Sequence, residues 1–467
     1  MKYEVRSKKD KKRKKQSSNL QTPGFRLRVG FTLVETLVAI GLGAIIFIGL
    51  FTAFQGGMRL LSENKARASA ISLANEKMEL IRNLPYEKVG TVGGIPPGAL
   101  PQEENATLNG INFTLKTFIQ YIDDPADGLS SQDENGITAD YKKVRIEVAW
   151  QGKSGKKSIA LISNFSPPGI ETITGGGTLI ISVLDANSNP VDRAEVKIEN
   201  SKVSPPISLT TLTNDQGKVI FPGSPATDSY KITINKTNYS TTKTYDVTPE
   251  NPNPNPGHLT ILEGETTEAT FFIDRLGSIS ADTFQYSEEL PLPKLPNLTF
   301  NIRGEKAIGK DSQGNPIYKY SQNLTTDNNG HLEIPNLEWD TYTMTISPTT
   351  GYDLMESCPP QPINLLPGGS IATTLTLVPH TQNTLLVLVK ESSGELIIVG
   401  ANVRLFNQTL GYNKSISSSN CGQAFFGSLD LSNNYSLEVT KSGYQDYLLE
   451  NIYISGQNNL TVILNKP

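Results

Sequence analysis

The apolar positions of this chain are concentrated in one segment near its beginning and are dispersed in alternating patterns after it. Residues 31–54 are apolar apart from Glu35 and a few Thr and Gly residues. At a rise of about 1.5 Å per residue, a helix of this length crosses a bilayer core of about 30 Å. We therefore expect a transmembrane helix over 31–54 that contains one carboxylate.

Helical character continues beyond the apolar segment. Met58–Leu84 is rich in Ala, Leu, Glu, Lys, Met and Arg, which are good helix formers. Pro85 should end the helix, because proline lacks a backbone N–H and clashes with the preceding turn. The sequence thus predicts one helix over 31–84 whose second half presents an apolar stripe to a protein surface. The stripe recurs every three or four residues and consists of Ile71, Ala74, Met78 and Ile81.

Strand patterns replace the helical pattern after Pro85. Residues 85–110 are rich in turn-forming residues and predict a loop. Further along, Val144, Ile146 and Val148 alternate with Arg and Glu, which is typical of a half-buried strand. We expect a small antiparallel sheet within 108–165 that forms a head on the long helix.

A self-similar pattern occurs three times in the rest of the chain. Each copy has a turn with glycine followed by alternating strands that contain a tyrosine. The glycines are 113 and 92 residues apart and the tyrosines 112 and 93, so two markers keep nearly the same spacing. Such a turn followed by alternating strands is typical of a small β-sandwich. The glycines are Gly217, Gly330 and Gly422, and the tyrosines are Tyr230, Tyr342 and Tyr435.

These markers predict three sandwich domains, at 176–275, 276–379 and 383–467. A chain of 467 residues is long enough for several domains, since one hydrophobic core rarely exceeds about 250–300 residues. The Pro-rich segment Asn251–Gly257 predicts an extended loop inside the first copy.

Charge is distributed very unevenly. Residues 1–30 carry eleven Lys and Arg against Glu4 and Asp10, whereas residues 31–467 carry a net charge of −13. A basic flank before a membrane segment predicts a cytoplasmic leader over 1–30 and a C-terminal part outside the cytoplasmic membrane. The acidic remainder gives no footprint for nucleic-acid binding.

The junction between leader and helix reads Gly30-Phe31-Thr32-Leu33-Val34-Glu35. Together with the apolar residues that follow, it resembles the N-terminus of type IV prepilins and related pseudopilins. The resemblance implies that a prepilin peptidase cuts between Gly30 and Phe31, that Phe31 is then N-methylated, and that Glu35 neutralises the Phe31 amine of a neighbouring subunit. A lone intramembrane carboxylate needs such a partner, because burying an isolated charge in hydrocarbon is costly.

The three repeats resemble the carboxypeptidase-regulatory-like and collagen-adhesin B-type sandwiches of bacterial surface proteins. The expected fold is therefore an α+β pilin-like N-terminal part, with a long helix and a small antiparallel sheet, followed by all-β Ig-like sandwiches. Together the two resemblances imply a type IV pilin-like subunit in a surface filament, and the 437 residues after Gly30 favour a minor or tip position. Its expected partners are the prepilin peptidase/N-methyltransferase, other pilin subunits, the inner-membrane assembly machinery, the membrane itself through residues 31–54, and a host or surface glycan.

Two other classes share part of this pattern. A type II secretion pseudopilin would carry the same residues 30–35, but three sandwiches would be a large extension for a subunit of a short pseudopilus. An uncleaved membrane-anchored surface protein with carbohydrate-binding-like domains would need neither cleavage nor polymerisation.

The remaining candidate chemistry is sparse. Cys358 and Cys421 are the two cysteines, and outside the cytoplasmic membrane we expect them to form a disulfide rather than two buried thiols. Asp123, Asp124 and Asp127 are weak Ca²⁺ candidates, because their spacing is not that of an EF-hand and a solvated turn explains them better. No nucleophile–base or phosphate-binding motif occurs in the sequence, so we expect neither an enzyme nor a cofactor.

Overall fold

The computed structural model describes residues 32–126, 128, 139–153, 155–168, 175–392 and 396–467. The predictions on Gly30, Phe31 and Asp127 fall outside these residues. By its internal contacts the chain divides into two units. The first contains most of the N-terminal helix together with 152–154, and the second contains residues 69–151 and 155–467.

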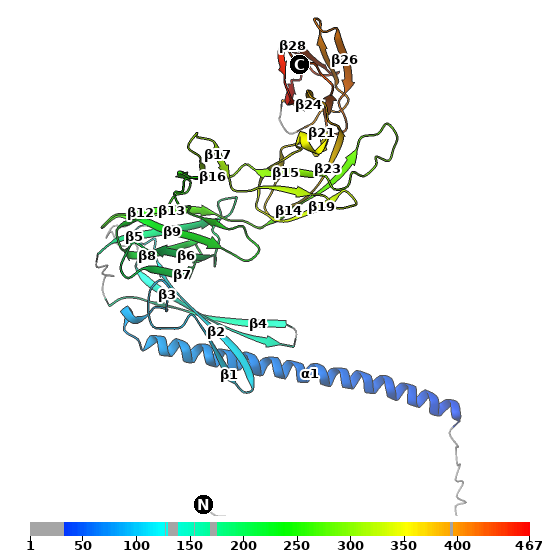
Figure 1. Cartoon of the computed structure of the whole chain (residues 1–467). Helices are drawn as coiled ribbons and strands as arrows, with labels where there is room; N and C mark the ends of the chain where they lie inside the picture. Colours follow the sequence, from blue (N-terminus) through cyan, green and yellow to red (C-terminus); the bar gives the residue numbers. More distant parts are fainter. Residues whose placement is uncertain (1–31, 127, 129–138, 154, 169–174, 393–395) are drawn as a thin grey trace, which may run out of the picture. The chain divides into compact units, whose positions relative to one another are not determined.

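One continuous helix opens the described chain (Figure 1). Helix α1 (Leu33–Arg82) contains 50 residues, and its last turn leads to Pro85 and the short 3₁₀ helix η1 (Tyr86–Lys88). In the second unit the side chains of Ala70, Ala74, Met78 and Ile81 are at most 1% exposed. The predicted stripe is thus correct in three positions and wrong at Ile71, which is 44% exposed.

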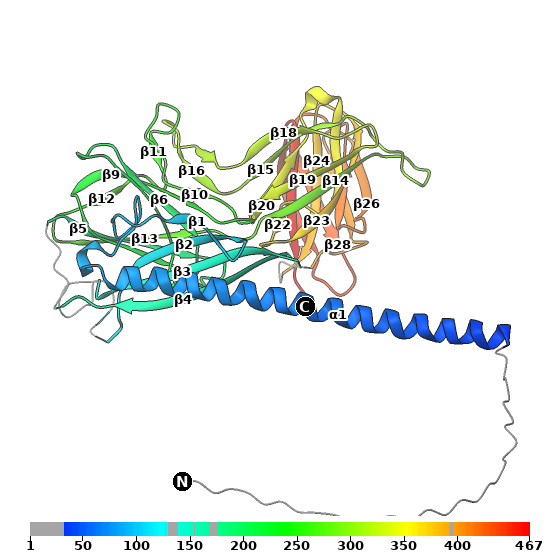
Figure 2. The ribbon, with the colours of Figure 1, turned by 90° about the horizontal axis from the view of Figure 1, so that it is seen from below.

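The head is a four-stranded sheet of order β1-β2-β3-β4 beside the C-terminal part of α1 (Figure 1, Figure 2). Its inner face contributes Phe113, Ile119 and Val144, each at most 2% exposed. Asn109 Nδ2 donates a hydrogen bond to Ser69 Oγ at 2.9 Å, and Lys77 Nζ lies 2.6 Å from Glu104 Oε1. The strands are β1 (Glu103–Leu108), β2 (Ile111–Ile122), β3 (Tyr141–Gly152) and β4 (Gly155–Phe165).

The prediction of a loop over the whole of 85–110 is wrong for β1. This strand pairs with β2 along Glu103–Leu108, at the edge of the sheet. None of its residues is fully buried. An edge strand with half-covered side chains lacks the apolar alternation by which strands are predicted from sequence.

Three sandwiches follow, here called sandwich 1, sandwich 2 and sandwich 3. Each consists of two facing sheets, and each pairs its first strand with its last strand in parallel. The expected fold class, a long helix with a small antiparallel sheet followed by all-β sandwiches, is therefore confirmed.

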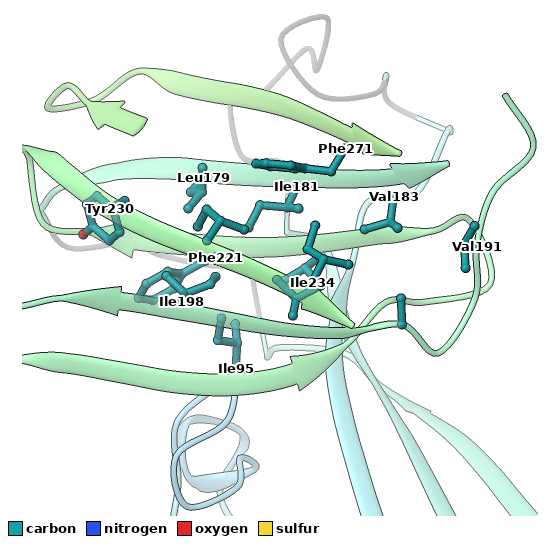
Figure 3. Close-up of a cluster of buried hydrophobic side chains, with 14 of the residues drawn as sticks. Ile95, Leu179, Ile181, Val183, Val191, Ile198, Phe221, Tyr230, Ile234 and Phe271 are labelled. Atoms are coloured by element: carbon teal, nitrogen blue, oxygen red, sulfur yellow. The ribbon is translucent and has the colours of Figure 1, made fainter. Parts of the chain in front are cut away.

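Sandwich 1 combines the sheets β13-β5-β8 and β10-β9-β6-β7, and β12 pairs with β9. Its core contains Leu179, Phe221, Tyr230, Ile234 and Phe271 between the two sheets (Figure 3). Ile95, from the loop between η1 and β1, also belongs to this core and connects the head to sandwich 1. The strands are β5 (Gly177–Leu184), β6 (Glu195–Asn200), β7 (Ile207–Leu212), β8 (Lys218–Ser224), β9 (Thr227–Asn235), β10 (Thr242–Lys243), β11 (Asn253–Pro254), β12 (Leu259–Ile261) and β13 (Thr266–Phe272).

Sandwich 2 combines the sheets β19-β14-β23-β21 and β18-β15-β20-β22, and sandwich 3 combines β27-β24-β30 and β26-β25-β28-β29. In sandwich 2 the elements are β14 (Gly277–Gln285), β15 (Thr299–Gly304), β16 (Ala307–Lys310), β17 (Pro316–Tyr318), β18 (Ser321–Thr325), β19 (His331–Leu337), β20 (Asp340–Thr345), η3 (Pro348–Thr350), β21 (Tyr352–Cys358), β22 (Ile363–Leu365) and β23 (Ser370–Pro379). In sandwich 3 they are β24 (Thr384–Glu391), β25 (Asn402–Asn407), β26 (Tyr412–Ser417), β27 (Gln423–Phe426), β28 (Ser432–Thr440), β29 (Tyr447–Ile454) and β30 (Gln457–Leu464).

The repeated glycine turn has the same construction in every sandwich. Gly217, Gly330 and Gly422 have φ between +67° and +71°, a conformation that glycine adopts without a steric penalty. The residue three positions before each glycine accepts backbone hydrogen bonds from the residues two and four positions after itself. These acceptors are Asn214, Asp327 and Ser419.

The repeated tyrosine is also equivalent in the three copies. Tyr230, Tyr342 and Tyr435 are at most 1% exposed. Each hydroxyl donates to a backbone carbonyl four or five residues earlier in the chain, at 2.8 to 3.2 Å. Burial raises the pKa of Tyr230 to about 12, so this phenol remains a donor at any physiological pH.

Candidate membrane anchor and assembly site

The N-terminus of α1 is closed by a reciprocal pair of side chains. The Glu35 N–H donates to Thr32 Oγ1 at 3.2 Å, and the Thr32 N–H donates to Glu35 Oε2 at 3.4 Å. The Thr32 hydroxyl also donates to Glu35 Oε2 at 3.3 Å. This is a capping box, which satisfies N–H groups that a helix leaves unbonded at its start. A carboxylate in the first turn is also favoured by the helix dipole, by about 0.3–1 kcal/mol.

Only one oxygen of the Glu35 carboxylate is used in this way. Among the described residues, no hydrogen bond reaches Glu35 Oε1. The capping box therefore orients the carboxylate and leaves its second oxygen without a hydrogen bond from the described residues. Sequence reasoning missed the role of Thr32, although the pattern Thr-x-x-Glu before an apolar run was the available signal.

The first half of α1 is an apolar surface without a protein cover in its unit. All residues from Thr32 to Leu61 are exposed. The most apolar window of α1 has a mean hydropathy of 2.5, and none of it is buried. After Glu35 the next charged residue is Arg59. By length and composition this helix can cross a membrane, and such a surface is stable only in lipid or against other apolar helices.

The two cysteines lie at the junction of sandwiches 2 and 3. Cys358, at the end of β21, is bonded to Cys421 in the glycine turn before β27, and their Cα atoms are 5.6 Å apart. The adjacent Ser357 N–H donates to Gln423 Oε1 at 2.9 Å, and Gln423 Nε2 donates back to the Ser357 carbonyl at 3.1 Å.

A buried carboxylate supports the same junction. Asp353 of β21 is 1% exposed, and its Oδ2 accepts the Thr381 N–H at 2.7 Å. Its Oδ1 lies 2.7 Å from His380 Nδ1 and accepts from Gln457 Nε2 of β30 at 2.5 Å. His380 lies in the linker between β23 and β24. The Asp353 site gave no sequence signal, because its partners come from distant positions in the chain.

Sandwiches 1 and 2 are joined by strand pairing. The Pro-rich segment 251–257, predicted as a loop inside the first copy, contains β11, which pairs with β16 of sandwich 2. Asn251 Nδ2 and the Asn255 N–H both donate to the Ile308 carbonyl, at 3.1 and 2.9 Å. Proline is tolerated here because β11 is at the edge of its small sheet.

A charged cluster lies near this junction and was not predicted. Lys306 Nζ is 2.8 Å from Glu338 Oε1 and 3.2 Å from the centroid of the Trp339 ring. Burial lowers the pKa of Lys306. Lys319 Nζ contacts the other Glu338 oxygen at 2.5 Å and donates to the Thr241 carbonyl of sandwich 1 at 2.7 Å. Trp339, a candidate for sugar stacking by its type, is thus covered by a lysine.

The weak Ca²⁺ candidates are described only in part. Asp123 is 1% exposed. The Asp124 Oδ1 atom accepts a hydrogen bond from the Ala126 N–H at 3.1 Å, and the Asp124 N–H donates one to Asp140 Oδ2. Within the described ranges, no three His, Cys, Asp or Glu side chains gather as metal ligands would. Because Asp127 lies outside these ranges, the three aspartates stay weak Ca²⁺ candidates, and a solvated turn stays the favoured prediction.

No protein-family model matches the chain, and no curated protein matches it significantly. Solved structures that are similar to it include the Bacillus anthracis TIE protein, at 16% identity and a TM-score of 0.18, over 79% of this chain and 74% of that one. A streptococcal ancillary pilin is similar at 13% identity and a TM-score of 0.18, over 62% and 99% of the two chains. BcpA, the major pilin subunit of Bacillus cereus, is similar at 10% identity and a TM-score of 0.17, over 62% and 100%. Likeness at this level establishes no family membership, so the function is argued from the chain itself.

Proposed function

We propose that this protein is a minor or tip subunit of a type IV pilus-like filament. A prepilin peptidase cuts it between Gly30 and Phe31, and Phe31 is N-methylated. Residues 31–54 hold it in the cytoplasmic membrane with its C-terminus outside until it enters a surface filament. Sandwiches 1 to 3 then act as an adhesive or spacer module that projects from the filament toward a host or surface glycan.

The observation that carries this proposal is the construction of the start of α1. An exposed apolar helix begins with a carboxylate held by a capping box, and one of its oxygens has no partner in the described chain. In a membrane or a helical bundle, an ionised carboxylate is costly unless a cation lies beside it. Cleavage after Gly30 would supply one, because it creates an ammonium group on Phe31.

The size of the chain favours a low-copy position. After Gly30 it has 437 residues, several times what a helix and one small head require. In a densely packed shaft, the three sandwiches of every protomer would have to be accommodated. At a tip, the filament would have to accommodate the sandwiches of only one copy.

The test replaces Glu35 by valine and measures two steps separately. Glu35→Val should still be cut after Gly30 but should be absent from sheared filaments, because its helix can no longer pair with a neighbouring amine. Glu76→Val, which removes an exposed carboxylate from the same helix, is the matched control and should be incorporated normally. Normal incorporation of Glu35→Val would overturn the proposal.

Two further outcomes would redirect it. Membrane-bound chains that retain residues 1–30 would indicate an uncleaved surface protein. Cleaved chains that immunogold labelling never places on surface filaments would indicate a secretion pseudopilin.

A further inference from the structure

The first and last strands of each sandwich pair with each other in parallel. In sandwich 1, β5 pairs in parallel with β13 over seven residue pairs, from Thr178↔Thr266 to Leu184↔Phe272. In sandwich 2, β14 pairs in parallel with β23 over eight pairs, and in sandwich 3 β24 pairs in parallel with β30 over eight. The chain therefore enters each sandwich at one end of a parallel ladder and leaves it at the opposite end.

This topology determines how a tensile force acts. When the N-terminal end of β5 and the C-terminal end of β13 are pulled apart, the two strands are drawn past each other along their own axes. All seven pairs then resist together, because the bonds of a parallel ladder are evenly spaced along it. Pulling both strands from the same end would instead open the pairs one after another.

The route of the force through sandwiches 1 and 2 follows from the order of the chain. Both sandwiches lie between α1 and sandwich 3. Once the contacts of Ile95 with the core of sandwich 1 and of β11 with β16 have separated, a pull between an anchored α1 and any contact made by sandwich 3 enters through β5 and β14. It leaves sandwich 1 through β13 and sandwich 2 through β23 or through Cys358.

The disulfide gives the force a second path at the last junction. Cys358 and Cys421 are separated by 63 residues, and the bond between them bypasses the intervening chain. That chain contains β22 to β26 and the short linker between the two sandwiches. A stretched, oxidised protein therefore cannot extend this segment, which amounts to about 220 Å of fully extended chain.

We infer that sandwich 1 is a force-bearing element between the anchored helix and any load applied beyond residue 275, and that its first and last strands are then loaded in shear. This function goes beyond the proposed one and does not depend on cleavage after Gly30. It requires only that the start of the chain is anchored and that the load is applied beyond residue 275.

The first experiment compares two pulling geometries on the same folded sandwich. An azide-bearing amino acid is placed at Ser166 and Arg275 of the full chain, or at Ser166 and Glu265, and DNA handles are attached for optical tweezers. All three positions are exposed. The first pair loads β5 and β13 from opposite ends, and the second loads them from the same end. Equal thermal melting curves of the two labelled proteins establish that both are folded.

The shear geometry should rupture at severalfold higher force than the peeling geometry at the same loading rate. Forced unfolding reports the barrier along the pulling direction, so the equilibrium stability shared by the two proteins cannot produce this difference. Equal rupture forces in the two geometries would overturn the inference.

The second experiment places the handles at Ser166 and Lys466 and unfolds the chain with and without a reductant. The fully unfolded chain should be about 220 Å longer when reduced, and Cys358→Ser/Cys421→Ser should match the reduced length without reductant. Equal lengths in all three samples would show that the bond does not bypass the segment. The N-methylation of Phe31 is measured independently, so failure here leaves the proposed function standing.

Discussion

Replacing Asp353 by asparagine tests how the junction between sandwiches 2 and 3 is held. The carboxylate is 1% exposed, and three partners from two parts of the chain contact it. Two of them, His380 and Thr381, belong to the linker, and the third, Gln457, belongs to sandwich 3. Asparagine keeps the shape of the side chain but removes its charge and turns one acceptor oxygen into a donor.

The size of the effect follows from these contacts. A hydrogen bond to a charged group contributes about 1.5–3 kcal/mol, and a buried donor that faces another donor costs about 1–3 kcal/mol. Asp353→Asn places an NH₂ group against either the Thr381 N–H or the Gln457 amide. We therefore expect the free energy of opening the junction to fall by about 3 kcal/mol, which is about two orders of magnitude in its opening equilibrium.

Hydrogen exchange measures this opening directly. The Thr381 amide is protected by its bond to Asp353 Oδ2, so a peptide covering residues 379–384 reports the junction. Asp311→Asn is the matched control, because Asp311 accepts a similar number of bonds in an exposed turn. A Thr381 exchange rate in Asp353→Asn that stays within about threefold of the wild type would refute this reasoning.

Two further predictions concern stability. Cys358→Ser/Cys421→Ser should lower the free energy of unfolding of sandwiches 2 and 3 by about 4 kcal/mol, as the chain-entropy model gives for this loop. Urea denaturation measures this loss, and a loss below about 1 kcal/mol would contradict the prediction. Burial lowers the pKa of His258 below its usual 6.5, although Asp246 Oδ1 lies 3.4 Å from its Nε2. The unfolded chain then binds this proton more readily than the folded one, so stability should fall as pH drops from 7 to 5. His258→Gln should reduce that fall, and an unchanged pH dependence of its urea midpoint would contradict the assignment.

The repeats were predictable from sequence because each marker residue is needed for the conformation or packing of its own turn or strand. Gly217 and its equivalents are required by a left-handed turn, and Tyr230 and its equivalents fill the core and bond a nearby carbonyl. Such positions tolerate few other residues, so they stand out in a single chain. The long helix was predictable for the same reason, since it depends on local propensity and ends at Pro85.

Features built from long-range contacts were not predictable. Ala70, not Ile71, faces the core, because only the path of the helix over the sheet decides between adjacent positions. Strand β1 is supported by β2 and carries no apolar alternation of its own. The pairing of β11 with β16 joins residues more than fifty positions apart in the chain. Asp353 is hidden for a similar reason, because its partners lie 27 to 104 positions away and come together only where sandwiches 2 and 3 meet.

The acceptor residues of the glycine turns are an intermediate case. The repeated pattern drew attention to the glycine of each turn, but the side chain that accepts the backbone hydrogen bonds lies three positions before that glycine. Asn214, Asp327 and Ser419 share acceptor chemistry rather than identity. A comparison by hydrogen-bonding capacity would have found them.

The proposed function requires that this chain is processed after Gly30 and built into a filament through Glu35 and Phe31. Mass spectrometry of the N-terminal peptide from purified surface filaments tests it most directly. We expect chains that begin with N-methyl-Phe31. Filaments that lack the chain, or chains that still carry residues 1–30, would contradict it.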